Sequence, residues 1–413
     1  MPFYTLVQLF CSDRKFPSFL LRGLTVLLLL LLLVSQALAH DFSGYISVEG
    51  RFFPNDALFP DQRSNNASLA VQPEYYHEWE NGSSFTLVPF ARLDSADDER
   101  THFDIRELNV LWVADLWELR IGIGKVFWGV TEFVHLVDII NQTDLVEAPD
   151  EEDKLGQPMV NLTFQRNWGT IDLFVLPYFR ERTFPGREGR LRTSPVVDTE
   201  NVIFESGQEE HHVDFAARYS HSIGNWDFGI YNFAGTGREP TLLLKFINPV
   251  QPVLIPFYEQ INQTGIDVQM VAGEWLWKLE ALYRTGQGKD FFSAVGGFEY
   301  TFTGVAGTRM DLGVIGEWAF DDRGDDAATP FENDIMFGLR IGVNDASTTE
   351  LLAGFSQDVD SSARVVSIEA SRRFGDRIKM TIEAGAFFDQ PEGDLLFSLG
   401  NDDFIRLELA YYF

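Results

Sequence analysis

The sequence predicts an all-β protein, a transmembrane antiparallel up-and-down β-barrel of about 18 strands, with 16 strands as the alternative. From Phe42 onward, apolar and polar residues alternate with a period of two, which is typical of strands with two unlike faces. The alternating segments run about 10–13 residues, whereas strands of globular proteins usually have five or six. Tight turns and long connections mostly alternate along the chain, as they do in outer-membrane barrels.

The alternation places the strands in order along the chain. The predicted strands are 42–52, 67–79, 83–93, 103–115, 117–127, 157–166, 168–179, 210–222, 224–234, 262–273, 274–285, 290–303, 308–320, 333–343, 348–358, 362–374, 377–389 and 402–413. The long connections between them are 53–66, 94–102, 128–156, 180–209, 235–261, 321–332 and 390–401.

Each predicted strand has one apolar face and one charged face. In 274–285, Trp275, Trp277 and Leu279 alternate with Lys278 and Glu280. A lipid-spanning chain must satisfy every backbone N–H and C=O internally, and a closed sheet does so without helices. A soluble sandwich would have shorter strands and a polar outer face, and a propeller would show a repeat of about 40 residues, which the sequence lacks. The apolar face is therefore expected to face lipid.

The two ends of the chain carry export and assembly signals. Residues 1–39 combine basic residues, an apolar run from Leu24 to Val34 and Ala37-Leu38-Ala39, which predicts a secretory signal peptide for the Sec pathway. An uncleaved anchor is the alternative, but the run is short for a span of about 20 residues. Residues 40–413 are expected to form a single barrel domain in the outer membrane of a Gram-negative cell. The last strand, ending at Phe413, is similar to the signal that barrel-assembly machinery reads.

The composition excludes several function classes. The formal charge of −30 argues against a nucleic-acid partner, which requires a basic face. The single cysteine, Cys11, lies in the predicted signal peptide, so disulfides are not expected. The sequence has no G-x-S-x-G or H-E-x-x-H motif, and His211-His212 has no third spaced ligand. We therefore expect no enzyme activity, no metal site and no cofactor.

The third long connection, 128–156, is a candidate constriction loop. It carries the polar residues Glu132, Asp138, Asn141 and Asp144, together with an apolar stretch over 133–140 that could form a short helix packed on the barrel wall. An apolar stretch is poorly placed in open water. The sequence favours a loop folded into the barrel, and a lid over the barrel mouth is the alternative.

Residues near this loop carry a resemblance to a known family. The run Gly124-Lys125-Val126-Phe127-Trp128-Gly129, followed by Leu136-Val137-Asp138-Ile139-Ile140-Asn141-Gln142-Thr143-Asp144, resembles an uncharacterised proteobacterial family of outer-membrane, porin-like β-barrels known only as a domain of unknown function. Gln142 stands where that pattern usually has proline. The segment 275–280 and the tail from Ser371 to Phe413 are also similar. The resemblance implies a porin-like barrel and no particular substrate; in general porins the corresponding connection narrows the channel.

The charged faces supply the candidate pore wall. Acidic residues on these faces include Glu49, Glu280, Glu317, Glu369 and Glu383. The candidate wall cations are Arg51, Arg120, Arg218, Lys278, Arg284, Arg340, Lys379 and Arg406. Wall cations facing an acidic loop would produce a transverse field in a water-filled pore. A charge lattice that only keeps the interior hydrated is the alternative.

Residues 180–192 form an arginine-rich segment in an otherwise acidic chain. Its candidate binding residues are Arg182, Arg187, Arg190 and Arg192. Guanidinium groups at a pore mouth could bind carboxylated or phosphorylated solutes or lipopolysaccharide. Pairing with neighbouring acidic loops is the equally favoured alternative.

Together these patterns predict a porin-like outer-membrane channel for passive diffusion of small hydrophilic or charged solutes. Its expected partners are outer-membrane lipid, lipopolysaccharide, the barrel-assembly machinery and the small solutes. A transporter of hydrophobic substrates such as fatty acids, or a closed structural barrel, is the alternative.

Overall fold

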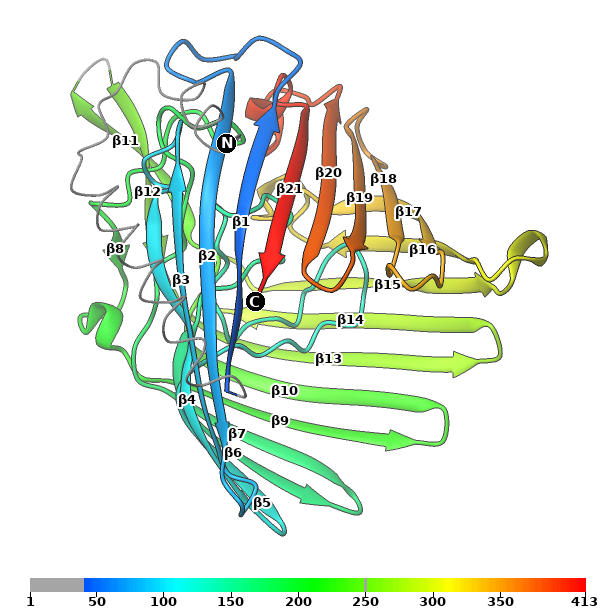
Figure 1. Cartoon of the computed structure of the whole chain (residues 1–413). Coiled ribbons are helices and arrows are strands. Elements are labelled where there is room, and N and C mark those ends of the chain that lie inside the picture. The colour runs from blue at the N-terminus through cyan, green and yellow to red at the C-terminus, as the bar shows by residue number, and fades with distance from the viewer. Residues whose placement is uncertain (1–40, 249–250) are drawn as a thin grey trace. The chain divides into compact units, whose positions relative to one another are not determined.

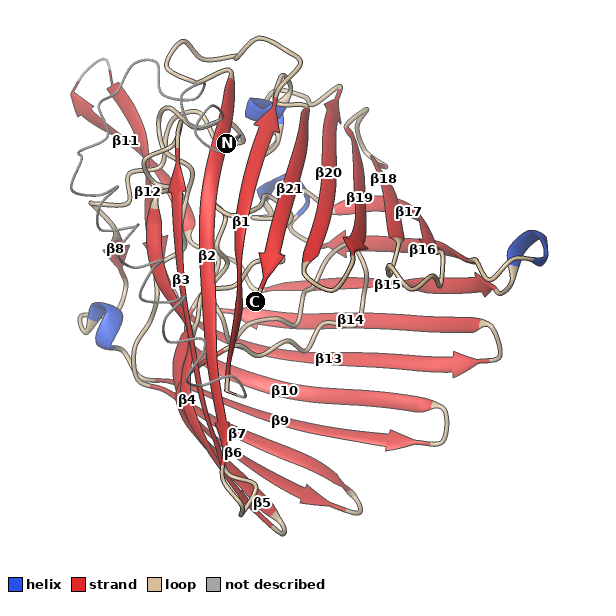
Figure 2. Cartoon of the chain, in the orientation of Figure 1, coloured by secondary structure: helices blue, strands red, loops and turns tan. Residues whose placement is uncertain are grey.

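The computed structural model describes residues 41–248 and 251–413, so the predicted signal peptide, 1–39, lies outside the described residues. Long strands forming a barrel dominate these residues (Figures 1 and 2). The barrel strands are β1 (Phe42–Phe52), β2 (Asn65–Glu78), β3 (Ser84–Asp94), β4 (His102–Ala114), β5 (Trp117–Gly124), β6 (Gln157–Arg166), β7 (Gly169–Leu176), β9 (Asp214–Ile223), β10 (Trp226–Thr236), β13 (Gln260–Ala272), β14 (Trp275–Thr285), β15 (Phe291–Phe302), β16 (Asp311–Asp321), β17 (Asn333–Gly342), β18 (Glu350–Asp358), β19 (Arg364–Phe374), β20 (Ile378–Phe388) and β21 (Phe404–Tyr412).

These strands form one closed 18-stranded sheet. Each strand pairs with its neighbours along the chain, and β1 also pairs antiparallel with β21, from Tyr45 opposite Tyr412 to Phe52 opposite Ile405. Closure leaves no unpaired strand edge. The predicted fold class and the preferred strand count are confirmed. Most predicted bounds differ from the observed ones by a few residues.

A second, smaller sheet lies within two connections that were predicted as loops. It consists of β8 (Ile203–Phe204), β11 (Thr241–Asn248) and β12 (Gln251–Tyr258), with β11 antiparallel and β8 parallel to β12. The sequence predicts long connections at 180–209 and 235–261 with no strands in them, and β8, β11 and β12 correct that prediction. The apolar run at the start of β11 does not alternate, and Pro252 and Pro256 of β12 resemble strand breakers.

Short helices are confined to the connections. They are the 3₁₀ helices η1 (Glu209–His211), η2 (Val305–Gly307), η3 (Gly324–Asp326) and η4 (Phe397–Leu399). Among the described residues, no helix has the length and apolar character needed to cross a membrane.

The barrel has two unlike ends. At one end, here called the turn end, short connections join β2 to β3, β4 to β5, β6 to β7, β9 to β10 and β13 to β14. At the other, here called the loop end, the long connections join β1 to β2, β3 to β4, β5 to β6, β7 to β9, β10 to β13, β16 to β17 and β20 to β21. The long segments 125–156 and 177–202 both begin at the loop end.

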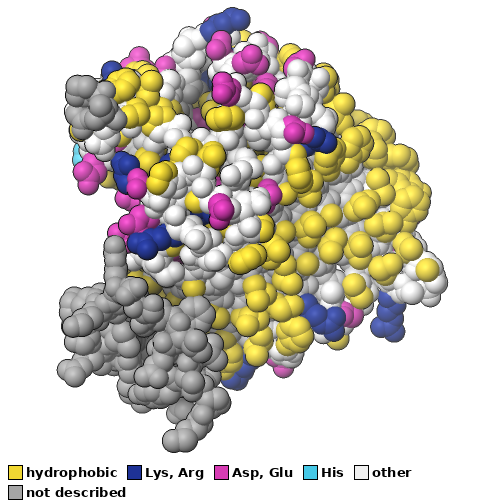
Figure 3. Space-filling model, turned by 90° about the horizontal axis from the view of Figure 1, so that it is seen from above, with side chains coloured by type: hydrophobic (Ala, Val, Ile, Leu, Met, Phe, Trp, Pro, Cys, Tyr) yellow, Lys and Arg dark blue, Asp and Glu magenta, His cyan; other side chains and the backbone are white. Residues whose placement is uncertain are grey.

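The two faces of the strands are oriented as predicted. On β14, Trp277 and Leu279 are 44% and 42% exposed, whereas Glu280 is completely buried. A broad field of apolar side chains covers the visible outer wall (Figure 3). Of the eight exposed tryptophans among the described residues, seven lie at or near the turn end, as expected of an aromatic girdle at a membrane interface: Trp79, Trp112, Trp117, Trp168, Trp226, Trp275 and Trp277. Trp318, on β16, lies toward the loop end. The barrel therefore spans a membrane.

Candidate functional site

Residues 125–156, here called the inner loop, leave β5 and return to β6 through a narrow neck. Asn141 closes this neck, since its side-chain amide donates to the carbonyl oxygens of Gly124 and Leu155 and its Oδ1 accepts from the N–H of Val126 at 2.8 Å. Asp138 Oδ1 accepts the N–H groups of Trp128 and Gly129. These two predicted constriction residues therefore fix the conformation of the loop itself, although both also line the lumen cavity described below.

The apolar part of the inner loop packs on the inner wall. Trp128, Val137, Ile139 and Ile140 are buried against inward residues of β6, β7, β9, β10 and β13. Further along the wall, Phe133, Val134 and Leu136 pack against Val295, Ala319 and Met336 of β15, β16 and β17. The short helix suggested for 133–140 is not formed. Its backbone N–H groups are instead satisfied in part by side chains of the wall.

Two carboxylates of the wall hold the backbone of the inner loop. Glu280 Oε1 accepts from the N–H groups of Val130 and Thr131 at 2.6 and 2.9 Å and from Thr131 Oγ1 at 2.7 Å, and its Oε2 accepts from the N–H of Val137.

Glu317, two strands away on β16, accepts the N–H groups of Glu132 and Phe133 at 2.8 and 3.1 Å. The charge of each glutamate compensates N–H groups that a non-helical buried segment would otherwise leave unsatisfied.

A glycine slot on the wall receives the ring of Phe133. Gly338 of β17 and Gly354 of β18 are cross-strand partners. A Cβ built on Gly354 would lie 2.7 Å from Phe133 Cε1, and one on Gly338 would lie 3.0 Å from Phe133 Cζ. The ring therefore occupies space that only these glycines leave free.

The second half of the inner loop is held by buried arginines of the wall and of the β3–β4 connection. Glu147 accepts from Arg92 Nε and Nη2, the latter at 2.7 Å, and its carbonyl oxygen accepts from Arg51. Asp144, a predicted constriction residue with no exposed surface, pairs with Arg106 at 2.7 Å. Burial alone would raise the pKa of Glu147, but Arg92 and Arg100 lower it below its usual value. The pairs keep this half of the loop ionised and attached.

The same region holds one group that could offer metal ligands among the described residues. His102 Nε2 lies 3.7 Å from Asp144 Oδ2 and 3.6 Å from Glu147 Oε1. Both carboxylates are already neutralised by Arg106 and Arg92. The arrangement is accounted for as an ion-pair cluster.

Glu132 is the predicted loop residue that meets the predicted wall cations. Its Oε2 lies 3.3 Å from Lys278 Nζ and 2.5 Å from Arg340 Nη2. Arg340 also pairs with Glu299. Arg218 stacks 5.1 Å from the Trp128 ring centroid and pairs with Asp267.

The remaining wall cations do not touch the inner loop through a described ion pair. Arg284 pairs with Glu239 at 2.8 Å, and Arg406 pairs with Glu49 and Glu383 at 2.8 and 2.7 Å. Arg120 and Lys379 are partly buried and form no ion pair with any described residue. The predicted wall set thus divides into cations that hold the loop and cations that lie along the rest of the lumen.

The inner wall of β18 to β21 is the part that the inner loop leaves uncovered. Inward residues here, such as Lys379, Glu383 and Arg406, are half-exposed, and Glu369 is exposed, whereas inward residues of β14 to β16 are almost completely buried. A cavity of about 320 Å³ lies between this wall and the loop. By cross-strand register, Arg406, Glu383, Glu369 and Leu352 form one row across this wall, and the last three line the cavity.

The cavity also has lining residues beyond the predicted constriction and wall residues. It includes Asp150, Glu152 and Lys154 from the inner loop, Arg238 and Glu239 from the connection after β10, and Arg323 after β16. Burial would raise the pKa of Glu239, but Arg284, Arg182 and Arg323 lower it to about 2. Partial desolvation by the surrounding barrel, together with neighbouring carboxylates, raises the pKa of Asp150 to about 6 and that of Glu152 to about 7.

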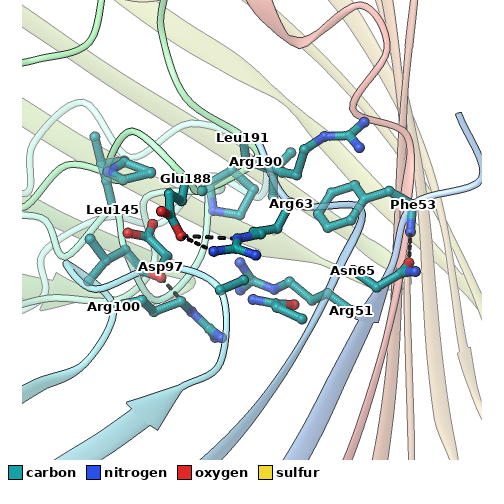
Figure 4. A pocket seen from close by; sticks show the side chains of 16 residues that line it. Arg51, Phe53, Arg63, Asn65, Asp97, Arg100, Leu145, Glu188, Arg190 and Leu191 are labelled. Carbon is teal, nitrogen blue, oxygen red and sulfur yellow. Dashed lines mark hydrogen bonds and ion pairs between the residues drawn. The ribbon is translucent and has the colours of Figure 1, made fainter. Parts of the chain in front are cut away.

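Residues 177–202, here called the strap, run from β7 to loops on other parts of the barrel. Arg190 pairs with Asp402 at 2.6 Å in a fully buried contact, and Leu191 N–H donates to the same carboxylate. Glu188 pairs with Arg63, and Gly186 N–H donates to Asp97. Figure 4 shows Arg63, Asp97, Glu188, Arg190 and Leu191 around a small pocket that Arg51 and Arg100 also line.

The predicted basic residues of the strap are occupied by protein groups. Arg182 donates to Gln142 and pairs with Glu151, and Arg187 pairs with Asp61 at 3.5 Å. Arg192 donates to the carbonyl oxygens of Arg187 and Thr193 and lies 4.8 Å from the Phe59 ring centroid. Gln142, which stands in place of the family's proline, also donates to Arg180 O and thus links the inner loop to the strap. Of the four predicted arginines, Arg182, Arg187 and Arg190 thus have carboxylate partners within the protein.

The comparisons with known proteins bear on the fold. No family model matches the sequence, and no curated protein matches it. The chain is similar to a BenF-like porin from Pseudomonas fluorescens Pf-5, with a TM-score of 0.50 and 10% identity over 90% of this chain and 97% of that one. It is also similar to a mutant of the Rh. blastica porin (TM-score 0.45, 12% identity, 90% and 99% covered) and to a loop-deletion mutant of OmpT, an outer membrane protein of Vibrio cholerae (0.43, 9%, 90% and 98%).

The likeness to the BenF-like porin supports the class of protein that the strand topology defines. The chain is a transmembrane β-barrel. Within that class, it has a porin-like fold of eighteen strands.

Proposed function

We propose that the protein is a porin-like channel for passive diffusion of small hydrophilic or charged solutes across the outer membrane of a Gram-negative cell. The observation that carries this proposal is the cavity of about 320 Å³ beside the inner wall of β18 to β21. A barrel of 16–18 strands is wide enough to leave an aqueous channel, because its inward side chains cannot fill it. Here the inner loop covers one side of the lumen and leaves the other side lined by half-exposed polar residues.

The charges along this lumen support a constriction. Glu132, Asp150 and Glu152 of the inner loop face the same cavity as Glu369 and Glu383 of the wall. Arg340, Arg406 and Lys379 supply positive charge nearby on β17, β21 and β20. Rings of charged side chains at a narrow point set ion preference in channels. In this proposal, Asp138, Asn141 and Asp144 act indirectly, because they hold the loop that forms the constriction.

The location and partners belong to the same proposal. The predicted signal peptide supports Sec export, and the apolar outer band supports insertion into outer-membrane lipid beside lipopolysaccharide. The final strand, β21, alternates outward Ile405, Leu407, Leu409 and Tyr411 with inward residues, which supports recognition by the barrel-assembly machinery. We also propose that the chain belongs to the porin-like family that its sequence resembles.

Conductance in planar lipid bilayers tests the function. The purified, folded protein should give stepwise, salt-dependent conductance, and its reversal potential in a salt gradient should report the ion preference. The absence of conductance from protein that is shown to be folded would contradict the channel and favour a closed structural barrel. Saturable binding of a fatty acid without ion conductance would instead favour the hydrophobic-substrate alternative.

A further inference from the structure

The lumen cavity has a basic flank whose charges are only partly compensated by the protein. Lys154, on the inner loop, is 6% exposed, and its ammonium donates to Thr143 Oγ1 at 3.1 Å without an ion pair to any described residue. Arg238 is 3% exposed and pairs with Asp214 through Nη1, but its Nη2 is buried without a hydrogen-bond partner. Both residues line the cavity, so an anionic group there would supply what the chain does not.

The same cavity has an acidic flank that is also uncompensated. Asp150 and Glu152 of the inner loop and Glu369 of β19 are exposed to the lumen. Within the part of the chain that the structure describes, none of the three forms an ion pair. The nearby Glu383 is already bonded to Arg406. A cationic group on this side would relieve the repulsion among these carboxylates.

The cavity lining also has an apolar part. It is bordered by Phe133 and Leu136 from the inner loop, Phe331 from the β16–β17 connection and Met336 from β17. An apolar surface of this kind favours a solute that carries a hydrocarbon body in addition to its charges.

The two flanks together restrict the class of solute. A solute with only a negative charge would gain from Lys154 and Arg238 but would be repelled by the acidic flank. A solute with only a positive charge would meet the converse penalty. A solute with both charges on an apolar body compensates both flanks at once.

We propose that this cavity binds zwitterionic solutes with an apolar body, of the class of aliphatic amino acids, with the carboxylate toward Lys154 and Arg238 and the ammonium toward Asp150, Glu152 and Glu369. The inference rests on the proposed channel function, and it names the solute class of that channel. It requires no covalent step and no cofactor.

A matched set of solutes tests the class. The four solutes share one branched hydrocarbon body and differ in charge. Leucine carries both charges, 4-methylpentanoate only the negative charge, 3-methylbutylamine only the positive charge and 4-methylpentanamide none. Their binding to the full-length protein in detergent is measured by calorimetry, and their flux is measured with protein-containing liposomes. Leucine should bind and permeate about five-fold better than either singly charged solute, which is the effect of one partly solvated charge pair. It should exceed the neutral amide, which lacks both pairs, by a larger factor. Equal values for all four, or a preference for either singly charged solute, would overturn the proposal.

Variants separate the two flanks. Lys154→Met should lower leucine binding about five-fold and strengthen the binding of 3-methylbutylamine, because it removes a positive charge that repels the amine. Glu369→Gln should lower the binding of both about equally. The matched controls Lys289→Met and Glu274→Gln, on exposed residues outside the cavity, should change neither. If Lys154→Met and Glu369→Gln leave leucine binding unaltered, the assignment of the flanks is wrong.

The calorimetric binding measurement also distinguishes this inference from the channel proposal. Leucine binding without ion conductance would refute the channel while supporting the solute class. Ion conductance without discrimination among the four solutes would support the channel and refute the proposed solute class.

Discussion

Replacing Glu280 with glutamine should release the inner loop from the wall. The buried carboxylate accepts hydrogen bonds from Val130 N–H, Thr131 N–H, Thr131 Oγ1 and Val137 N–H. Hydrogen bonds to a charged group contribute about 1.5–3 kcal/mol each, against about 0.5–1.5 kcal/mol for neutral ones. Glutamine can keep its oxygen at the Oε1 position, but its NH₂ group then faces the Val137 N–H, which loses its acceptor.

The cost of this substitution follows from these contacts. Weakening three bonds by about 1 kcal/mol each and leaving one donor unsatisfied, at about 1–3 kcal/mol, destabilises loop attachment by about 4–6 kcal/mol. Glu317 still accepts from Glu132 and Phe133, so attachment is weakened at one end and not abolished. The loop should therefore leave the wall intermittently while the strands of the barrel stay paired.

Two measurements follow the loop directly. In planar bilayers, E280Q should show larger and noisier conductance than the wild type, and limited proteolysis should cut within 128–156 faster. Thermal unfolding should show that the barrel remains folded. Glu274→Gln, on an exposed turn, is the matched control. If E280Q has the same protease resistance and conductance as this control, Glu280 does not hold the loop.

Three further predictions concern other contacts. Gly354→Ala should displace the Phe133 ring, since the new Cβ would lie 2.7 Å from it, and change the single-channel conductance; Gly50→Ala, with its nearest atom at 4.0 Å, should not. Asp402→Ala leaves Arg190 buried without its carboxylate partner and should weaken strap attachment by about 3–5 kcal/mol, which is measured as faster proteolysis of 177–202. Asp61→Ala, at an exposed ion pair, is the control and should cost about 0–1 kcal/mol. The pKa values of Asp150 and Glu152 are raised to about 6 and about 7, so both carboxylates are charged above these pH values. Lowering the pH from about 8 to about 5 should protonate them and reduce the cation preference of the channel in reversal-potential measurements. An unchanged preference would contradict their place along the path of the ions.

The strands could be predicted closely because one physical rule acts along their whole length. Lipid on one side and the lumen on the other impose a period of two, and this period is visible at Trp277, Lys278 and Leu279 without any tertiary information. The rule fails where its cause is absent. β11 and β12 lie in a connection, so their runs of leucine and their prolines carry no alternation.

The candidate site was less accessible to sequence analysis. The alternation identified Glu280 and Glu317 as inward residues, but a period of two cannot tell whether an inward carboxylate meets water, an arginine or a backbone N–H. Arg92 and Arg106 alternate on the inward faces of β3 and β4 and could have been included on the same rule. Lys154 and Arg238 lie in connections, where no periodicity indicates direction, and only the folded chain brings them to one cavity.

The inner loop contacts strands that lie far apart in the sequence and are therefore synthesised at different times. It leaves β5, yet its contacts include Arg92 on β3, Glu280 on β14, Glu317 on β16 and Arg340 on β17. Those later strands are translated more than a hundred residues after the loop itself. Final seating of the loop therefore cannot precede the placement of β14 to β17 during biogenesis, and a chain stalled before that stage would hold an unseated, apolar segment.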